Sequence, residues 1–207
     1  MALEAYRRKR NFSRTPEPEG SDVSESSGAP RFVIQEHDAS SRHFDFRLEV
    51  DGALRSWAVP KGPSTDPAEK RLALPTEDHP LDYADYEGVI PEGEYGAGTV
   101  LLWDSGTYRN LKADEDGDPI SLGDQLSDGH ATVWLEGEKL RGGFALTRVG
   151  EEEDERWLLV KMDDEEADAR RNPVSTEPES VKSGRTLEEV AEDEAPGDEE
   201  SEEGEDG

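Results

Sequence analysis

The sequence contains no cysteine, and only 31% of its 207 residues are hydrophobic. The missing cysteine excludes disulfide bonds, thiolate metal sites and cysteine nucleophiles. No apolar run approaches the roughly 20 residues of a membrane-spanning helix, and the N-terminus has no signal-peptide core. We therefore expect a cytoplasmic protein that has no membrane partner.

Basic residues are scarce as well: 23 Lys and Arg stand against 52 Asp and Glu, which gives a net charge of −29. A chain this acidic and this poor in apolar residues either has large disordered parts or works in high salt. A halophilic bacterial or archaeal host is our hypothesis. Nucleic-acid binders usually present a basic face, so the overall charge argues against such a partner but permits a local basic groove.

Composition divides the chain into three parts. Residues 1–30 open with a basic cluster from Arg7 to Arg10 and continue as a linker rich in Pro, Glu and Ser, so we predict an N-terminal arm. Residues 31–171 consist of short apolar runs between turn signals, which is typical of an all-β fold, here a compact small β-barrel. Residues 172–207 are acidic and lack apolar periodicity, which predicts a disordered tail.

Turn signals set the expected strand boundaries. Asp51-Gly52 predicts a hairpin between two strands. Asp104-Ser105-Gly106 predicts a second turn, and residues 76–87 are expected to form a loop. Helix should be limited to short turns, such as one from Thr186 to Glu192.

One segment of the predicted barrel carries a candidate site. Alternate side chains of a β-strand share a face, so His43, Asp45 and Arg47 point the same way. On the preceding strand, Gln35 and His37 share a face by the same rule. Two adjacent strands can therefore bring two imidazoles, a carboxylate, a guanidinium and an amide together.

These residue types favour metal and phosphate chemistry. Two neutral imidazoles and a carboxylate, here from His37, His43 and Asp45, form an open site for a divalent transition metal. The guanidinium of Arg47, on the same face of the strand, suits the binding of a phosphate or carboxylate substrate. His79 could act as a second cationic clamp or as a proton donor, as a phosphoesterase with Mn²⁺ or a similar ion would need.

Two rival interpretations remain open from the residues alone. His43-x-Asp45, with His130 and Arg141 further along, has the spacing of a cupin-like Fe(II)/2-oxoglutarate oxygenase, whose triad is built from a His-x-Asp pair and a distant His. The other rival is a binding module that recognises a 3'-phosphate without turnover.

Four long sequence blocks stand out: KRNFSRTPEP (9–18), FVIQEHDASSRHFDFRLE (32–49), WAVPKGPS (57–64) and DHPLDYADYEGVIPEGEYGAGTV (78–100). These blocks resemble the 3'-phosphoesterase domain of bacterial DNA ligase D, and the similarity runs from about residue 3 to about residue 191. Because no Lys-x-Asp-Gly adenylation motif and no polymerase domain are visible, we expect a stand-alone phosphoesterase.

The resemblance implies a Mn²⁺-dependent enzyme that processes DNA 3' ends for end joining. Such enzymes remove a 3'-terminal ribonucleoside to leave a 3'-phosphate and then hydrolyse that phosphate to a 3'-hydroxyl. The implied partners are DNA or DNA–RNA 3' ends on a primer–template, with separate ligase and polymerase components. We expect a monomer.

The resemblance also implies residue roles. His37, His43 and Asp45 match the metal ligands, and Arg47 and His79 match the residues that contact phosphate. Other matching positions divide into catalytic residues, Tyr83 and Lys61, and substrate-binding residues, Gln35, Arg10, Glu17 and Arg71.

One position departs from the family motif. Asn11 stands where the family has an aspartate in Lys-Arg-Asp-Phe. An amide keeps hydrogen bonding but loses charge and basicity. The departure therefore weakens the expectation of ribonucleoside removal more than that of phosphate hydrolysis.

Overall fold

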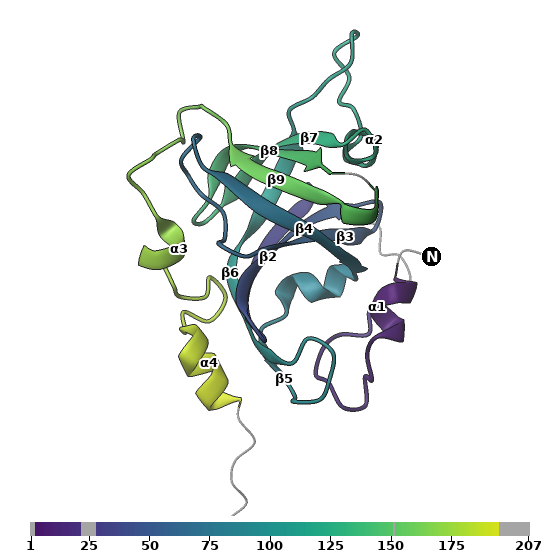
Figure 1. The fold of residues 1–207 in the computed structure, drawn as a ribbon, viewed down its shortest axis with the longest axis vertical. Coiled ribbons are helices and arrows are strands. Elements are labelled where there is room, and N and C mark those ends of the chain that lie inside the picture. The colour runs from purple at the N-terminus through teal and green to yellow at the C-terminus, as the bar shows by residue number, and fades with distance from the viewer. Residues whose placement is uncertain (1–2, 22–27, 151, 195–207) are drawn as a thin grey trace, which may run out of the picture.

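The strands close into an antiparallel barrel of eight strands, and Figure 1 shows their arrangement. This computed structural model describes residues 3–21, 28–150 and 152–194. The order is β1-β2-β3-β4-β9-β8-β7-β6, and β6 pairs back with β1, while β5 extends the edge of β6. The prediction of a small all-β barrel is confirmed. The strands are β1 (Arg31–Asp38), β2 (Arg42–Val50), β3 (Ala53–Val59), β4 (Lys70–His79), β5 (Gly88–Ile90), β6 (Gly98–Asn110), β7 (His130–Gly137), β8 (Arg141–Val149) and β9 (Arg156–Lys161).

Few helical elements accompany the barrel, as expected. They are α1 (Glu4–Arg8), α2 (Leu122–Ser127), α3 (Pro173–Thr176) and α4 (Leu187–Asp193), with 3-10 turns η1 (Leu81–Asp85) and η2 (Glu152–Asp154). None of the helices in the described part of the chain is long and apolar enough to cross a membrane.

Two apolar clusters lie on opposite sides of the barrel wall. The interior is filled by aromatic and aliphatic side chains that include Phe46, Trp57 and Trp157, as in other small barrels. The second cluster joins Val33 of β1 to Tyr6 of α1, among others, and therefore covers the outer face of the wall. Because the interior is packed with side chains, a ligand site has to be built on this outer face.

The predicted turn at Asp104-Ser105-Gly106 is wrong, because β6 runs through it. The Asp104 carboxylate instead accepts hydrogen bonds from the backbone amides of residues 138–140 and so closes the turn between β7 and β8. A Cβ on Gly106 would lie 2.0 Å from the carbonyl oxygen of Glu136, so only glycine permits the close approach of β7. Asp104 and Gly106 thus lie within a strand, and they stabilise the neighbouring turn between β7 and β8 and the close approach of β7.

The loop expected over residues 76–87 is also wrong in its first part. β4 continues to His79, and η1 follows. Pro75 pairs with Trp57 of β3 but lies beyond residues 70–73, which pair with β9. One side of β4 is therefore unpaired at this position, and a residue without an N–H is tolerated there. This extension of β4 brings Glu77 and His79 to the outer face.

The predicted disordered tail is wrong for residues 172–194, which pack against the barrel (Figure 1). Leu187 and Val190 of α4 belong to the main apolar cluster, and Thr186 and Glu189 form a capping box. The indole of Trp103 donates to the carbonyl of Glu177 at 2.8 Å. The rest of the predicted tail, residues 195–207, lies outside the described residues.

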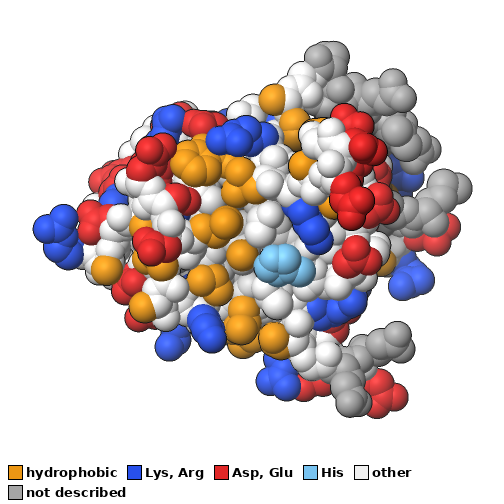
Figure 2. Space-filling view, turned by 90° about the horizontal axis from the view of Figure 1, so that it is seen from above, with side chains coloured by type: hydrophobic (Ala, Val, Ile, Leu, Met, Phe, Trp, Pro, Cys, Tyr) orange, Lys and Arg blue, Asp and Glu red, His pale blue; other side chains and the backbone are white. Residues whose placement is uncertain are grey.

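The surface is charged but not evenly so. In Figure 2, hydrophobic side chains gather in a band along one face, with acidic and basic side chains around them. Among described residues the large exposed hydrophobic side chains are Leu72, Leu74, Tyr95 and Val149. Single exposed apolar residues are ordinary, and only Tyr95 lies beside the site described below.

We expect Leu187→Ala to lower the free energy of unfolding by about 2–4 kcal/mol, because it leaves a cavity in the main apolar cluster. Denaturant unfolding followed by tryptophan fluorescence measures the change. The exposed Glu192→Ala on the same helix is the control and should shift stability by less than about 0.5 kcal/mol. Equal effects of the two variants would mean that α4 does not contribute to the core.

Candidate metal centre and anion pocket

A cavity of about 250 Å³ lies on the outer face of β1 and β2. Its other walls come from the N-terminal arm, the turn between β1 and β2, β4, η1, β5 and the loop after β5. These segments cover the outward-facing side chains of β2. Asp45 and Arg47 are therefore only 6% and 3% exposed, although they lie outside the barrel core.

The register of β1 and β2 brings the predicted donors together. Gln35 lies opposite Asp45, and His37 lies opposite His43. The Nδ1 atom of His37 is 3.7 Å from Asp45 Oδ2, and Nε2 of His43 is 3.5 Å from Asp45 Oδ1. One donor atom from each residue lies within 4.8 Å of the other two.

This donor set fits a divalent transition metal. Atoms that share one ion at about 2.1 Å generally lie about 3–4 Å from one another. The outer ring nitrogens contact carbonyl oxygens, which can only accept: His37 Nε2 is 2.7 Å from Gly96 O, and His43 Nδ1 is 2.9 Å from Ser41 O. These contacts orient the other nitrogen of each ring toward Asp45, as outer hydrogen bonds do in metal sites.

Asp45 is a buried carboxylate that stays charged. Burial alone would raise its pKa, but the charge of Arg47 and the hydrogen bonds of His37 and His43 outweigh burial and hold the pKa well below its usual range. The hydrogen bond from His43 to Asp45 in turn raises the pKa of His43. A bound metal ion has to displace that proton, so metal affinity should weaken at acidic pH.

Arg47 is fixed by hydrogen bonds on all sides. It donates through Nε to Gln35 Oε1 at 2.7 Å, through Nη1 to Ser56 Oγ at 2.9 Å and through Nη2 to Asp45 Oδ2 at 3.2 Å. Its guanidinium also lies 5.0 Å from the centre of the Tyr83 ring. The cation is therefore held in place before any anion binds.

Gln35 differs from the expectation that it binds substrate. It is fully buried and does not line the cavity. Its amide nitrogen donates to the carbonyls of Tyr83 and Tyr86, and its oxygen accepts from Arg47. Gln35 thus links the guanidinium to the backbone that follows η1.

His79 is a neutral imidazole in the free protein. Burial, followed by the charges of Arg47 and Arg10, holds its pKa well below the usual range. Its Nδ1 lies 2.9 Å from the carbonyl oxygen of Glu77 and 3.1 Å from Arg47 Nη1, and its Nε2 lies 3.4 Å from Arg10 Nη2. A neutral imidazole has one acceptor nitrogen, which can accept from one of these two guanidinium groups because arginine only donates. In this state His79 accepts a hydrogen bond in the cavity and cannot act as a cationic clamp.

The N-terminal arm folds over the cavity and supplies Arg10. Arg10 pairs with Glu17 at 2.9 Å and with Glu77 at 3.2 Å, and Tyr83 donates its hydroxyl to Glu17 at 3.0 Å. Burial and the charge of Glu17 raise the pKa of Tyr83 well above its usual value, so the phenol stays protonated. Glu17 itself does not line the cavity, and it organises the two side chains that do.

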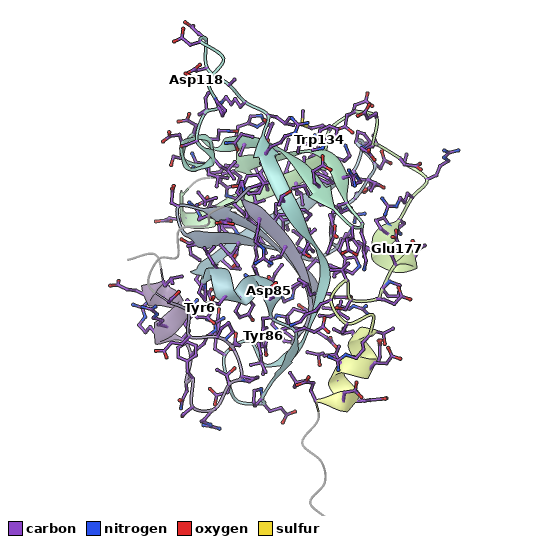
Figure 3. The ribbon with its side chains drawn as sticks, turned by 180° about the vertical axis from the view of Figure 1, so that it is seen from behind. Tyr6, Asp85, Tyr86, Asp118, Trp134 and Glu177 are labelled. Carbon is purple, nitrogen blue, oxygen red and sulfur yellow. The ribbon has the colours of Figure 1, made fainter. Side chains whose placement is uncertain are left out.

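Tyr6 anchors this arm to the barrel. Its side chain is fully buried in the outer apolar cluster, and Figure 3 shows it between α1 and the barrel. Its hydroxyl donates to the carbonyl of Pro18 at 2.6 Å, and its ring lies 3.9 Å from the guanidinium of Arg10.

Three positions suggested by the resemblance lie away from the cavity. Lys61 is exposed in the turn after β3, and Arg71 lies at the opposite end of β4 from His79. Asn11 is exposed, and its side-chain oxygen accepts from the backbone amide and the hydroxyl of Ser13. An aspartate would accept the same two bonds, so the departure at Asn11 concerns a turn in the arm.

The oxygenase triad is not formed. His130 is exposed at the start of β7, with Nδ1 3.0 Å from Thr147 Oγ1. Arg141 is also exposed and pairs with Glu136. Within the described ranges, the cluster of three possible metal donors consists of His37, His43 and Asp45.

Sequence reasoning missed several residues of the site. Ser56 was detectable, because the hairpin at Asp51-Gly52 fixes its position opposite Arg47. Glu77 shares a strand face with His79, but the segment was expected to be a loop. Tyr95 and Gly96 reach the cavity through the fold of a glycine-rich loop, which strand periodicity does not reveal.

The fold and the site together define the class of protein. It is a small β-barrel protein with a candidate metal centre and an anion pocket on the outer face of the barrel. Residues 35–148 match the family model described as the DNA Ligase D 3'-phosphoesterase domain. The chain belongs to this family, as its sequence blocks indicated.

Curated relatives support the same assignment. The chain is 49% identical over 189 residues to the multifunctional non-homologous end joining protein LigD of Pseudomonas aeruginosa, which covers 89% of this chain and 22% of that protein. It is 45% identical over 160 residues to the LigD of Mycobacterium tuberculosis, which covers 77% of this chain and 20% of that protein. The chain thus spans about a fifth of the length of these relatives.

We expect His79→Asn to reduce the acid sensitivity of the metal-free protein. His79 has a lowered pKa in the folded state, so the unfolded state takes up its proton first, and stability falls as the pH drops below the ordinary value of 6.5. Thermal melting in EDTA between about pH 7 and about pH 5 measures this loss. The exposed His130→Asn should behave like the wild type, and an undiminished loss in His79→Asn would contradict the argument.

Proposed function

We propose that this protein is a metal-dependent phosphoesterase that processes DNA 3' ends in non-homologous end joining. It removes a 3'-terminal ribonucleoside and then hydrolyses the remaining 3'-phosphate to a 3'-hydroxyl. The observation that carries the proposal is the cluster of His37, His43 and Asp45 donors beside the fixed guanidinium of Arg47. Membership in a 3'-phosphoesterase domain family supports it.

His37, His43 and Asp45 would hold the ion, which we propose to be Mn²⁺ because imidazole and carboxylate donors suit such metals. A divalent cation there offsets negative charge on a phosphoryl oxygen during hydrolysis. Arg47 would bind the remaining phosphoryl oxygens as a second positive group, with its orientation maintained by Gln35 and Ser56.

His79 is proposed to change its protonation with substrate. Burial is the main cause of the low pKa of His79, followed by the charges of Arg47 and Arg10. A phosphate between the two arginines would offset those charges and place a negative charge beside the ring, which favours the imidazolium form. The imidazole would then take up a proton and donate it to the oxygen that leaves phosphorus as water attacks. That oxygen is the 5'-oxygen of the ribonucleoside in the first step and the 3'-oxygen of the DNA in the second. Tyr83 would support this step by holding Glu17, the partner of Arg10.

The substrate is proposed to approach past the N-terminal arm. Arg8 and Lys9 are exposed there, next to the cavity residue Arg10. Lys9 pairs with Glu77 at 3.2 Å. On a chain of net charge −29, this short basic segment is where we propose that a phosphate backbone lies. We further propose that the protein acts as a monomer, with a separate polymerase and ligase before and after its step.

A primer–template whose primer ends in one ribonucleotide tests the proposal. With Mn²⁺ we expect loss of the ribonucleoside followed by phosphate release, and neither with EDTA. Asp45→Asn should lower the rate at least about 100-fold, because a neutral amide is a poor metal ligand. Arg47→Ala should mainly raise KM, while metal binding persists.

The matched control is Arg141→Ala. Arg141 is an exposed arginine that does not line the cavity, so this variant should keep the wild-type rate. Tight binding of a 3'-phosphate end without phosphate release would instead indicate a binding module. Full activity of the Asp45 and Arg47 variants would refute the site assignment.

We also propose that the acidic surface is an adaptation to high salt. Salt weakens phosphate contacts, but it screens the repulsion among the acidic groups. Initial rates measured in increasing KCl should therefore be sustained into the multimolar range. A rate that falls steadily from low salt upward would contradict this adaptation.

A further inference from the structure

Tyr95 lies at the mouth of the candidate site. It lines the same cavity as His37, Arg47 and His79, yet 46% of its surface is exposed. An exposed aromatic residue has no meaning by itself. Tyr95, however, is exposed and also lies beside the metal-donor cluster. A ligand bound in the cavity could therefore contact it.

The loop that carries Tyr95 is tied to the site at both sides of the residue. Gly96 follows it with φ of 76°, a left-handed conformation that favours glycine. The Gly96 carbonyl is 2.7 Å from His37 Nε2, and Glu94 pairs with Arg14 of the arm at 3.0 Å. Tyr95 therefore has a defined position relative to the metal donors.

Two cations hold the ring in place. Lys9 Nζ lies 3.2 Å from the Tyr95 hydroxyl and 4.7 Å from the ring centre, and the guanidinium of Arg10 lies 5.3 Å from the ring centre. Cations attracted to the ring fix its orientation. Because the ring is already ordered before a base binds, stacking of the base on it costs less conformational entropy.

We propose that Tyr95 is the stacking platform for the nucleobase of the 3'-terminal nucleotide, an inference that rests on the proposed function. With a terminal phosphate bound at Arg47, the attached sugar and base would extend toward the mouth of the cavity, and Tyr95 both lines this cavity and is exposed to solvent. Every base has a π-face, so stacking tolerates any sequence. Stacking therefore suits an enzyme that acts on DNA ends of any sequence.

The test compares two DNA ends that carry the same 3'-phosphate. One ends in an ordinary nucleotide, and the other ends in an abasic tetrahydrofuran residue. Removal of a stacked aromatic side chain costs about tenfold or more in affinity. Tyr95→Ala should therefore raise KM about tenfold on the ordinary end and leave the abasic end unchanged, with kcat little affected on both.

Variants separate stacking from loop architecture. Tyr95→Trp and Tyr95→Phe should keep the preference for the ordinary end, since both offer an aromatic face. Glu92→Ala, an exposed change in the same loop, should match the wild type. An equal loss of Tyr95→Ala on both ends would mean that Tyr95 acts through the loop, and would overturn the proposal.

A spectroscopic readout separates this proposal from the proposed function. The fluorescence of a 3'-terminal 2-aminopurine falls when the base stacks, and this quenching needs no turnover. Quenching by the wild type that is lost in Tyr95→Ala supports the platform even if no phosphate is released, in which case only the proposed function fails. Phosphate release without Tyr95-dependent quenching overturns the platform alone.

Discussion

The site depends on the buried ion pair between Asp45 and Arg47. The two residues are two positions apart on β2, so their side chains share one face of the strand. A buried pair of charges is costly unless its remaining hydrogen-bonding groups are also satisfied. Gln35 and Ser56, on the strands on either side, satisfy the guanidinium. The imidazoles of His37 and His43 approach the carboxylate from the other side.

This pair explains why the cavity lies outside the barrel. The interior is occupied by apolar side chains that make up the main core, and charged groups there would lack partners. On the outer face, the N-terminal arm, η1 and the loop after β5 cover the charged groups without displacing the core. The cavity therefore combines low solvent exposure with charged groups that are all paired.

Electrostatic balance limits what the cavity can bind. Arg10 and Arg47 are matched in the free protein by Glu17, Glu77 and Asp45. Under the proposed function, attraction for an anion would therefore come from a cation held by the donor cluster and from sharing of the guanidinium groups. It cannot depend on a long-range field, because the chain as a whole is strongly negative.

The sequence by itself determined the all-β class, the hairpin at Asp51-Gly52 and the common face of His43, Asp45 and Arg47. These features follow from a strand period of two and from local turn chemistry, which need no distant partner. Only the tertiary structure decided that Asp104 closes a turn 35 residues away and that Lys61 and Arg71 lie off the cavity. It also decided that Glu77 and Tyr95 enter the cavity and that residues 172–194 pack on the barrel, because such contacts join segments whose local patterns carry no information about each other.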